Sequence, residues 1–451
     1  MTQNQNSLTA LTEHMLSAAK KAGADSADAI ALRGTSLSIE VREHKLEHAE
    51  RSEGVDIGLR VFIGDRQAIV SGSDIKPMTL ELMAERAVAM AKEAPEDRYS
   101  GLADPDMFAT DLDVSKLEMY DTASEPDPSE LEAMAKEAES AAASIKGVTQ
   151  VQASGSGYEE RDVHIATSNG FSGGYRRTHT SLSCVAIAGE GVAMERDYDG
   201  DTRIFASDLR SAEEIGRSAG ERAIQRLNPQ KPKTGVYPVL FDERISSSLI
   251  GHLLGAVNGA SVVRGSTWAK DLLGQQILPT ELSLIEDPHR PRANGSRPFD
   301  GEGLPTQRRA IVENGILTGW TLDLASARKL NMAPTGNAAR GISGPPSPAS
   351  WNVALTQGSK SHQDMLRDMG TGFLVTSMIG STINSTTGDY SRGAAGFWVE
   401  NGELQYPVSG VTIAGNLIDM LKRLVPANDA RAHLSTVVPS LLVDGMTLAG
   451  S

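Results

Sequence analysis

The sequence predicts an α+β protein built from two regions of different composition. In the first half of the 451-residue chain, amphipathic helix patterns alternate with groups of strand-like runs, as in a sheet covered by helices. The second half contains many glycines, short strand patterns and few long helix patterns, which favours a β-rich mixed sheet or a barrel-like domain. The polar, proline-containing run Asn228–Gly235 (NPQKPKTG) is typical of a linker. We therefore expect an N-terminal α+β domain over 1–228, a linker over 229–235 and a C-terminal domain over 236–451.

The N-terminal region shows one order of elements twice. Ser7 can cap the first helix and Gly23 can end it, because Gly tolerates the left-handed conformation common after a helix. The rest of the first unit is predicted to hold strands over 28–32, 37–41, 55–62 and 67–70 and a helix over 79–92. The second unit is predicted to hold a helix over 130–145, strands over 148–154, 163–167, 176–188 and 192–198, and a helix over 212–227. The shared order indicates a candidate duplication, with repeats over 7–94 and 128–227.

The stretch between these units, residues 95–128, is acidic and rich in Pro, Asp and Ser. Such composition predicts an irregular connector that lies on the surface.

Two hairpins are strongly predicted in the C-terminal region. Arg309–Trp320 and Gly396–Pro407 each place Glu-Asn-Gly between runs of alternating apolar residues, and Asn-Gly suits the positive φ angles of a two-residue turn. The remaining expected elements are a strand over 236–241, helices over 323–330, 362–368 and 415–424, a strand pair over 373–387 and a final strand over 440–448. Because Pro238 cannot donate a backbone hydrogen bond, it favours an edge or first position for its strand.

Charge and composition exclude several classes of function. The 43 Lys and Arg residues are outnumbered by 58 Asp and Glu residues, and a net charge of −15 argues against a nucleic-acid ligand. No apolar run approaches the ~20 residues that a membrane span needs, and the start of the chain lacks the basic and apolar parts of a secretory signal. We therefore expect a cytoplasmic protein. The lone Cys184 excludes an intrachain disulfide and a multi-cysteine metal site, and its alternating surroundings predict a small buried residue.

One short motif could bind a metal. His44-Lys-Leu-Glu47-His48 matches the inverted zinc-peptidase order H-x-x-E-H, in which two imidazoles hold zinc and Glu activates water. That chemistry needs a helix inside a substantial core, whereas the surrounding VREHKLEHAERSEG is polar throughout. The context favours a solvated hairpin or loop, and an independently active metallopeptidase using His44, Glu47 and His48 stays an alternative.

The stretch Val236–Trp268 organises the C-terminal region. After the first strand, Asp242 can cap a helix whose apolar residues recur at helical spacing. The opposite face of this helix carries small residues, among them Gly251 and Gly255, which predicts that another segment packs close to its backbone.

These residues resemble the central segment of the TldD/PmbA family. In the TldD type this helix carries His-Glu-x-x-x-His with zinc between the imidazoles, whereas alignment on Arg264-Gly265 places Ile250, Gly251 and Gly255 at those positions. None of the three can bind a metal or move a proton. The chain also lacks any cysteine after Cys184, so the late cysteine ligand of the TldD type is absent. Further runs similar to the PmbA (TldE) type are 331–337, 384–403, 406–416 and 440–450.

The resemblance implies a subunit of a cytoplasmic metalloprotease complex that acts on unfolded or short peptides. Zinc is expected in a TldD-type partner subunit, with no cofactor, metal ligand or catalytic residue in this chain, which would instead shape the substrate chamber. We single out Asn258, Arg264, Asp300 and Arg392 as candidate polar groups lining such a cleft, with turns and the subunit interface as the alternative role. A homodimer of the isolated chain, or a self-associating binding protein without a catalytic link, stays open. Some family members are called modulators of DNA gyrase, but no residue pattern here indicates contact with DNA.

Overall fold

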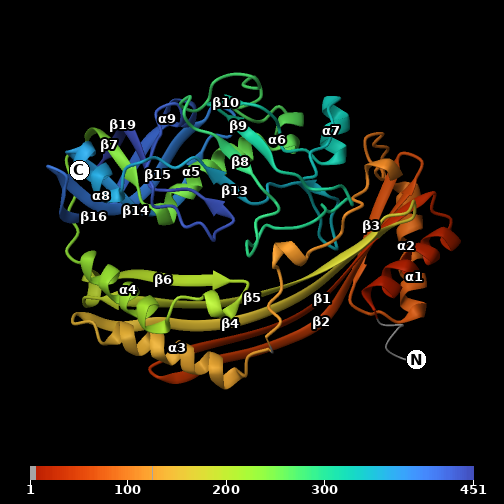
Figure 1. The fold of residues 1–451 in the computed structure, drawn as a ribbon, viewed down its shortest axis with the longest axis horizontal. Helices are drawn as coiled ribbons and strands as arrows, with labels where there is room; N and C mark the ends of the chain where they lie inside the picture. Colours follow the sequence, from red (N-terminus) through yellow and green to blue (C-terminus); the bar gives the residue numbers. More distant parts are fainter. Residues whose placement is uncertain (1–6, 124, 451) are drawn as a thin grey trace.

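A long, curved six-stranded sheet forms the N-terminal half of the computed structural model, which describes residues 7–123 and 125–450. The strand order is β3-β2-β1-β4-β5-β6, and all neighbours are antiparallel (Figure 1). The first unit contributes α1 (Leu8–Ala22), β1 (Ser26–Arg42), β2 (Lys45–Ile63), β3 (Arg66–Gly72) and α2 (Pro77–Glu93). The second unit contributes α3 (Pro128–Ala143), β4 (Val148–Thr167), β5 (Ser172–Ala188), β6 (Glu195–Arg203) and α4 (Ala212–Gln225). Each unit therefore runs helix, three strands, helix, and the two units meet where β1 pairs with β4.

The central strands are longer than the sequence patterns predicted. The separate runs expected over 28–32 and 37–41 belong to the single strand β1, which stays paired with β4 from Asp28 to Val41. On one face of β1, alanines at its start pack against α1 and α2, and apolar residues near its end pack against α3. The polar residues between these two runs therefore lie between the part of β1 covered by α1 and α2 and the part covered by α3. No helix within the described residues covers the sheet there, so no apolar side chain is needed.

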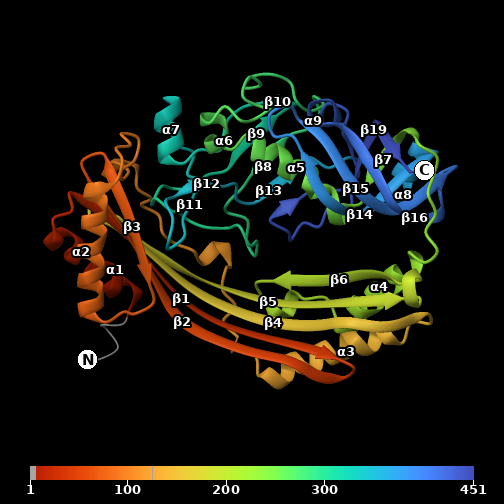
Figure 2. The same ribbon diagram turned by 180° about the vertical axis from the view of Figure 1, so that it is seen from behind.

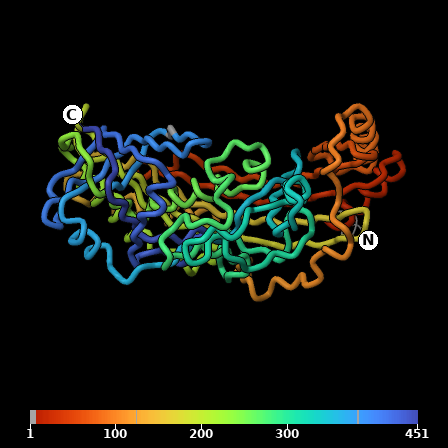
Figure 3. Tube along the Cα trace, turned by 90° about the horizontal axis from the view of Figure 1, so that it is seen from above, coloured from red at the N-terminus to blue at the C-terminus, as the bar shows by residue number. Residues whose placement is uncertain are grey.

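The two faces of this sheet have different neighbours. The face with Ala27, Ala29 and Ala31 carries the helices, and the opposite face, with Ile30 and Leu32, is directed toward the C-terminal half. Figures 1 and 2 show α1, α2 and α3 on the outer side of the curved sheet and the C-terminal domain along its inner side. From above, the C-terminal domain follows the length of the strands (Figure 3).

The connector between the two units is irregular and mostly exposed, as predicted, but a few of its residues are anchored against both halves of the molecule. It contains two short 3-10 turns, η1 (Pro105–Met107) and η2 (Ser115–Leu117), and buries Ala103, Ala109 and Met119. Its backbone is bound from both halves of the molecule: the amide of Ala109 donates to the carbonyl of Gly303 at 2.9 Å, and the carbonyl of Met119 accepts from the amide of Thr178. Because these hydrogen bonds satisfy its polar backbone, an acidic irregular segment can be partly buried.

A closed five-stranded barrel forms one part of the C-terminal domain. Its strands follow the order β16-β15-β14-β7-β19, and pairing of β16 with β19 closes the ring, with β17 added at β19. A second sheet, β10-β9-β8-β13-β18, packs beside it, and both contribute to one large apolar core. The strands are β7 (Gly235–Phe241), β8 (Leu284–Glu286), β9 (Arg309–Glu313), β10 (Ile316–Leu317), β11 (Ala338–Ala339), β12 (Ser347–Pro348), β13 (Val353–Leu355), β14 (Gly372–Ile383), β15 (Asp389–Glu400), β16 (Glu403–Asn416), β17 (Val425–Pro426), β18 (Thr436–Val437) and β19 (Leu441–Ala449). The helices are α5 (Glu243–Ala256), α6 (Gly259–Val263), α7 (Leu324–Leu330), α8 (His362–Met369) and α9 (Leu417–Leu421).

Local turn signals in this domain are confirmed, and one longer-range prediction is wrong. Asn314 and Asn401, each followed by Gly, have positive φ angles and form the turns of the β9–β10 and β15–β16 hairpins. The region over 373–387 holds one strand, β14, rather than a strand pair. Of the two positions that Pro238 favoured, β7 takes the first: it is the first strand of this domain, although it lies between β14 and β19 rather than at an edge. Pro238 is tolerated there because the β14 pairing starts one residue later and β19 has a register shift opposite it.

The prediction that Cys184 is a small buried residue is confirmed. Its side chain is fully buried between β5 and the helices α3 and α4, and burial raises the pKa of the thiol to about 12. No helix within the described part of the chain is long and apolar enough to cross a membrane.

Candidate functional site

Helix α5 starts directly where strand β7 leaves the barrel. The amide of Asp242 donates to the carbonyl of Val375 on β14 at 3.0 Å, and its carboxylate caps the helix by accepting from the amide of Arg244. The apolar stripe of α5, including Leu249 and Leu253, enters the C-terminal core. The helix is therefore fixed at its first turn and along one side.

The three positions aligned with a zinc motif lie in two different environments. Ile250 is fully buried in the core, whereas Gly251 and Gly255 are exposed. A Cβ added at either glycine would meet no atom within 4 Å among the described residues. No described segment of this chain packs closely against these two glycines, so the close approach predicted for this face stays a prediction about another chain or a peptide. Gly259, in contrast, packs tightly, since a Cβ there would lie 2.7 Å from the side chain of Leu322.

Two adjoining hollows meet at Gly251, and we call them together the α5 groove. One, of about 360 Å³, is lined on its far side by Met378 of β14 and Arg392 of β15. The other, of about 260 Å³, is lined by residues of α5, α6 and α9, of the loop after α6, and of the end of β14 with the loop that follows it: Gly251, His252, Gly255, Ala256, Ser261, Ser266, Thr267, Trp268, Ile383, Ser385 and Leu417. Between residues 373 and 375 β14 pairs with β7, and after Val375 its described pairing is with β15 alone. The groove thus runs between the open glycine face of a helix and a strand with one free edge.

Polar atoms without partners line this groove. Ser248 Oγ, His252 Nε2 and Arg392 Nε are buried and have no hydrogen-bond partner among the described residues. Burial first, and then the charge of Arg392, lower the pKa of His252, so its ring is neutral at pH 7. A neutral imidazole, a hydroxyl and a guanidinium suit the amide and carbonyl groups of a peptide.

The four polar residues singled out from the sequence are not brought together. Arg392 lines the α5 groove. Asn258 caps α6 through the amide of Ala260 and donates to the carbonyl of Pro348, so it holds a turn. Arg264 is exposed at the end of α6 and contacts Ser261. Asp300 is buried near the N-terminal sheet, where its carboxylate accepts from three backbone amides.

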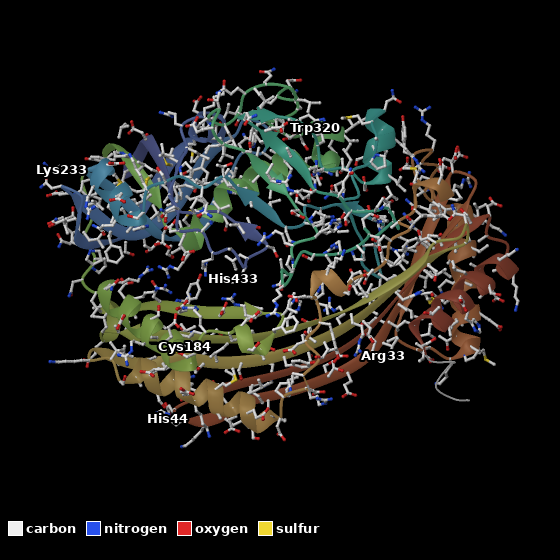
Figure 4. The ribbon with its side chains drawn as sticks, in the orientation of Figure 1. Arg33, His44, Cys184, Lys233, Trp320 and His433 are labelled. Carbon is white, nitrogen blue, oxygen red and sulfur yellow. The ribbon has the colours of Figure 1, made fainter. Side chains whose placement is uncertain are left out.

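The H-x-x-E-H motif does not form a helix. Glu43 and His44 have positive φ angles and make the two-residue turn between β1 and β2, so His44 and His48 are not one helical turn apart. The backbone amide of His44 donates to Glu139 of α3 at 2.8 Å. Figure 4 shows His44 on the far side of the sheet from the C-terminal domain. This is the hairpin that its polar context favoured.

Whether zinc could bind at the three aligned positions of α5 depends on the ligand atoms that their side chains offer. Isoleucine and glycine side chains at 250, 251 and 255 offer no ligand atom, and a hydrolytic zinc site needs about three protein ligands. Within residues 7–123 and 125–450, no group of three or more His, Cys, Asp or Glu side chains could hold a metal ion. The residues at the aligned positions therefore do not fit the ion.

Comparison with known proteins follows the same division of the chain. The family models for PmbA/TldA metallopeptidases match three segments: domain 1 over residues 27–91, the central domain over 121–227 and the C-terminal domain over 234–450. The chain is also similar to the metalloprotease PmbA of Escherichia coli O157:H7, with 39% identity over 94% of this chain and 92% of the relative. The chain belongs to the PmbA/TldD family. A PmbA homolog of Haemophilus influenzae is 38% identical over 96% of this chain and 94% of its own length.

Solved structures of related proteins share the fold of this PmbA/TldD chain. A Bacteroides thetaiotaomicron protein described as a proposed modulator of DNA gyrase superposes with a TM-score of 0.90 and 29% identity, covering 98% of both chains. TldE from Thermococcus kodakarensis superposes with a TM-score of 0.84 at 21% identity, covering 98% of this chain and all of that chain, and shows the shared fold. The α+β class and the barrel predicted for the C-terminal domain are confirmed.

Sequence reasoning missed part of this groove in the PmbA/TldD chain. Ser248 and Met378 lie about 130 residues apart and carry no motif, and only the meeting of α5 with β14 brings them together. The run of small residues on α5 was the one local signal that pointed to the site.

Proposed function

We propose that this chain is the non-catalytic subunit of a TldD/TldE-type metallopeptidase complex in the cytoplasm. A TldD-type partner supplies zinc and hydrolysis, and this chain shapes the chamber that receives the peptide. Membership of the PmbA/TldD family and similarity to TldE support the partner, and the residues of α5 support the division of labour.

One observation carries the proposal. Where the related zinc-binding type is expected to hold two imidazoles and a carboxylate, this chain has a buried isoleucine and two exposed glycines. A helix face without side chains leaves room for another backbone to approach closely. The part of α5 that corresponds to the metal site of the partner is thus open in this chain to the backbone of a peptide or of another subunit.

The α5 groove suits an extended peptide. The edge of β14 beyond Val375 offers backbone donors and acceptors to an added strand, and Arg392 and His252 offer side-chain contacts. Main-chain pairing makes few demands on sequence but requires an unfolded or short substrate. The proposal therefore names unfolded or short peptides as the substrate class.

The test is reconstitution of the complex. The chain is purified alone, together with a TldD-type chain from the same genome, and that partner is purified alone as a control. Zinc content is measured by atomic emission and peptide cleavage by chromatography. We expect zinc and turnover only in samples that contain the partner, and a stable complex on size exclusion. Stoichiometric zinc with turnover in the isolated chain would overturn the proposal, and so would a chain that elutes only as a homodimer beside the partner.

A further inference from the structure

A second site lies away from the α5 groove, between the N-terminal sheet and the C-terminal domain. It is a cavity of about 250 Å³. Its floor is the inner face of β1, β4 and β5, and strand register places its residues in rows across the sheet. The rows are Ile30 beside Ile165; Leu32, Val163 and Tyr175; Arg161 beside Arg177; and Glu159 beside His179.

The roof of this cavity comes from the C-terminal domain. Arg297, Phe299, Asp300 and Gly301 lie on the loop between β8 and β9, and Arg340 follows β11. Phe299 packs against Tyr175 of the floor with 5.7 Å between ring centroids. Both halves of the molecule therefore contribute side chains to one site, which exists only when the two are docked.

The cavity is lined by more positively charged side chains than negatively charged ones. Arg161 pairs with Glu159, and Arg340 pairs with Asp28, but neither Arg177 nor Arg297 has a carboxylate within 4 Å among the described residues. Asp300 also lines the roof, but its oxygens accept from three backbone amides rather than from Arg177 or Arg297, and burial raises its pKa to about 6.

Several nitrogen atoms in the wall remain without partners. Arg177 donates through its terminal nitrogens to the carbonyls of Asn294 and Ser296, but its Nε is buried and has no hydrogen-bond partner among the described residues. The same holds for Nε2 of His179 and Nε of Arg340. Burial lowers the pKa of Arg177 to about 10, with the charge of Arg297 acting in the same direction. Partly buried cations without a paired carboxylate are costly, and an anion would neutralise them.

We propose that this cavity binds a small organic anion, with a carboxylate or phosphate head between Arg177 and Arg297. A guanidinium can donate two hydrogen bonds to two oxygens of a carboxylate or a phosphate, and its positive charge favours these anions over neutral groups. The apolar body of the ligand lies against Ile30, Leu32 and Val163, beside the rings of Tyr175 and Phe299. The bound anion bridges the sheet and the C-terminal domain, so it stabilises their docking.

Binding can be measured on the full chain without any partner, so the result is independent of the proposed peptidase role. Isothermal calorimetry uses phenylacetate, phenyl phosphate and inorganic phosphate, with phenylacetamide as a neutral match for phenylacetate. We expect phenylacetate or phenyl phosphate to bind at least about tenfold more tightly than phenylacetamide, the effect of one charge-assisted hydrogen bond. Comparing phenylacetate with phenyl phosphate shows whether the site prefers a carboxylate or a phosphate head. Binding of inorganic phosphate shows whether the head alone is enough for binding.

Two variants and a matched control locate the site. R297Q and R177Q each remove one guanidinium charge, and we expect each to weaken anion binding at least about tenfold. R176Q changes the neighbouring residue on β5, an exposed arginine paired with Glu160 and Asp162, and should leave binding unchanged. If R177Q fails to fold, as judged by circular dichroism, R297Q alone decides the outcome. Equal affinity for phenylacetate and phenylacetamide, no binding of any probe, or unchanged binding in R297Q would overturn the proposal.

Discussion

Asp28 of β1 and Arg340, just after β11, form an ion pair across the junction between the N-terminal sheet and the C-terminal domain. Both side chains are only 2% exposed. Asp28 also accepts from Nε of Arg60 on β2 at 2.8 Å, so one carboxylate serves two guanidinium groups. A buried carboxylate in this position ties the two halves of the molecule together and neutralises charge that cannot reach water.

The D28N substitution should therefore be strongly destabilising. It leaves two buried arginines with less compensation, and removing one partner of a buried pair costs about 3–5 kcal/mol. Urea denaturation followed by circular dichroism measures the change in the free energy of unfolding. The control is E213Q, which breaks the exposed pair with Arg217 and should cost less than about 1 kcal/mol. A D28N effect no larger than that of E213Q would contradict this account.

Two glycines on neighbouring helices should respond oppositely to alanine. Gly251 lies on an open face of α5, so G251A should stabilise the fold by about 0.5–1 kcal/mol through its higher helix propensity. Gly259 packs against Leu322 and the carbonyl of Thr321, so G259A should destabilise the fold by about 1–3 kcal/mol. Thermal and chemical denaturation of the isolated chain decide the signs, and a stabilised G259A or a destabilised G251A would refute the packing described for these helices.

Blocking the α5 groove should reduce peptide cleavage without harming the fold, if the proposed complex is correct. R392M removes a guanidinium that lines the groove, and loss of one charge-assisted contact should raise KM by about tenfold. R264M is the matched control, because Arg264 is exposed and lies outside both hollows. Steady-state cleavage by the reconstituted complex gives kcat and KM for each. Equal KM values for the two variants would remove Arg392 from the substrate path.

The free energy of unfolding should fall as the pH rises through the pKa of His362. The carboxylate of Asp429, 3.6 Å from Nδ1, raises the pKa of this imidazole above its ordinary value of 6.5. A raised histidine pKa means that the folded state holds the proton more tightly. The stabilisation is therefore complete below pH 6.5 and lost as the pH rises through the folded value.

The check is the free energy of unfolding between pH 5.5 and pH 8.5, compared with H362Q. The difference between the two proteins should shrink toward high pH, because H362Q has no proton to lose. A difference that does not depend on pH would show that His362 does not titrate with folding.

Local chemistry made much of this molecule predictable. Caps such as Asp242 and turns such as Asn401-Gly402 depend on residues within a few positions of one another, so their patterns can be found in any single chain. The expected metal motif also lies within one helix. Its replacement by Ile250, Gly251 and Gly255 is therefore evident from the order of residues alone.

Long-range pairing decided the rest. A barrel strand tolerates Pro238 because β19 changes register opposite it, and the connector is anchored at a few residues because both domains bind its backbone. Arg177 and Arg297 are 120 positions apart and share a cavity only because the C-terminal domain docks on the inner face of the sheet. The sequence by itself determined the fold class, the local turns and the missing ligand atoms on α5. Which surfaces meet, and which charges are left without partners where they meet, was decided only by the tertiary structure, because burial depends on contacts between segments that no local pattern records.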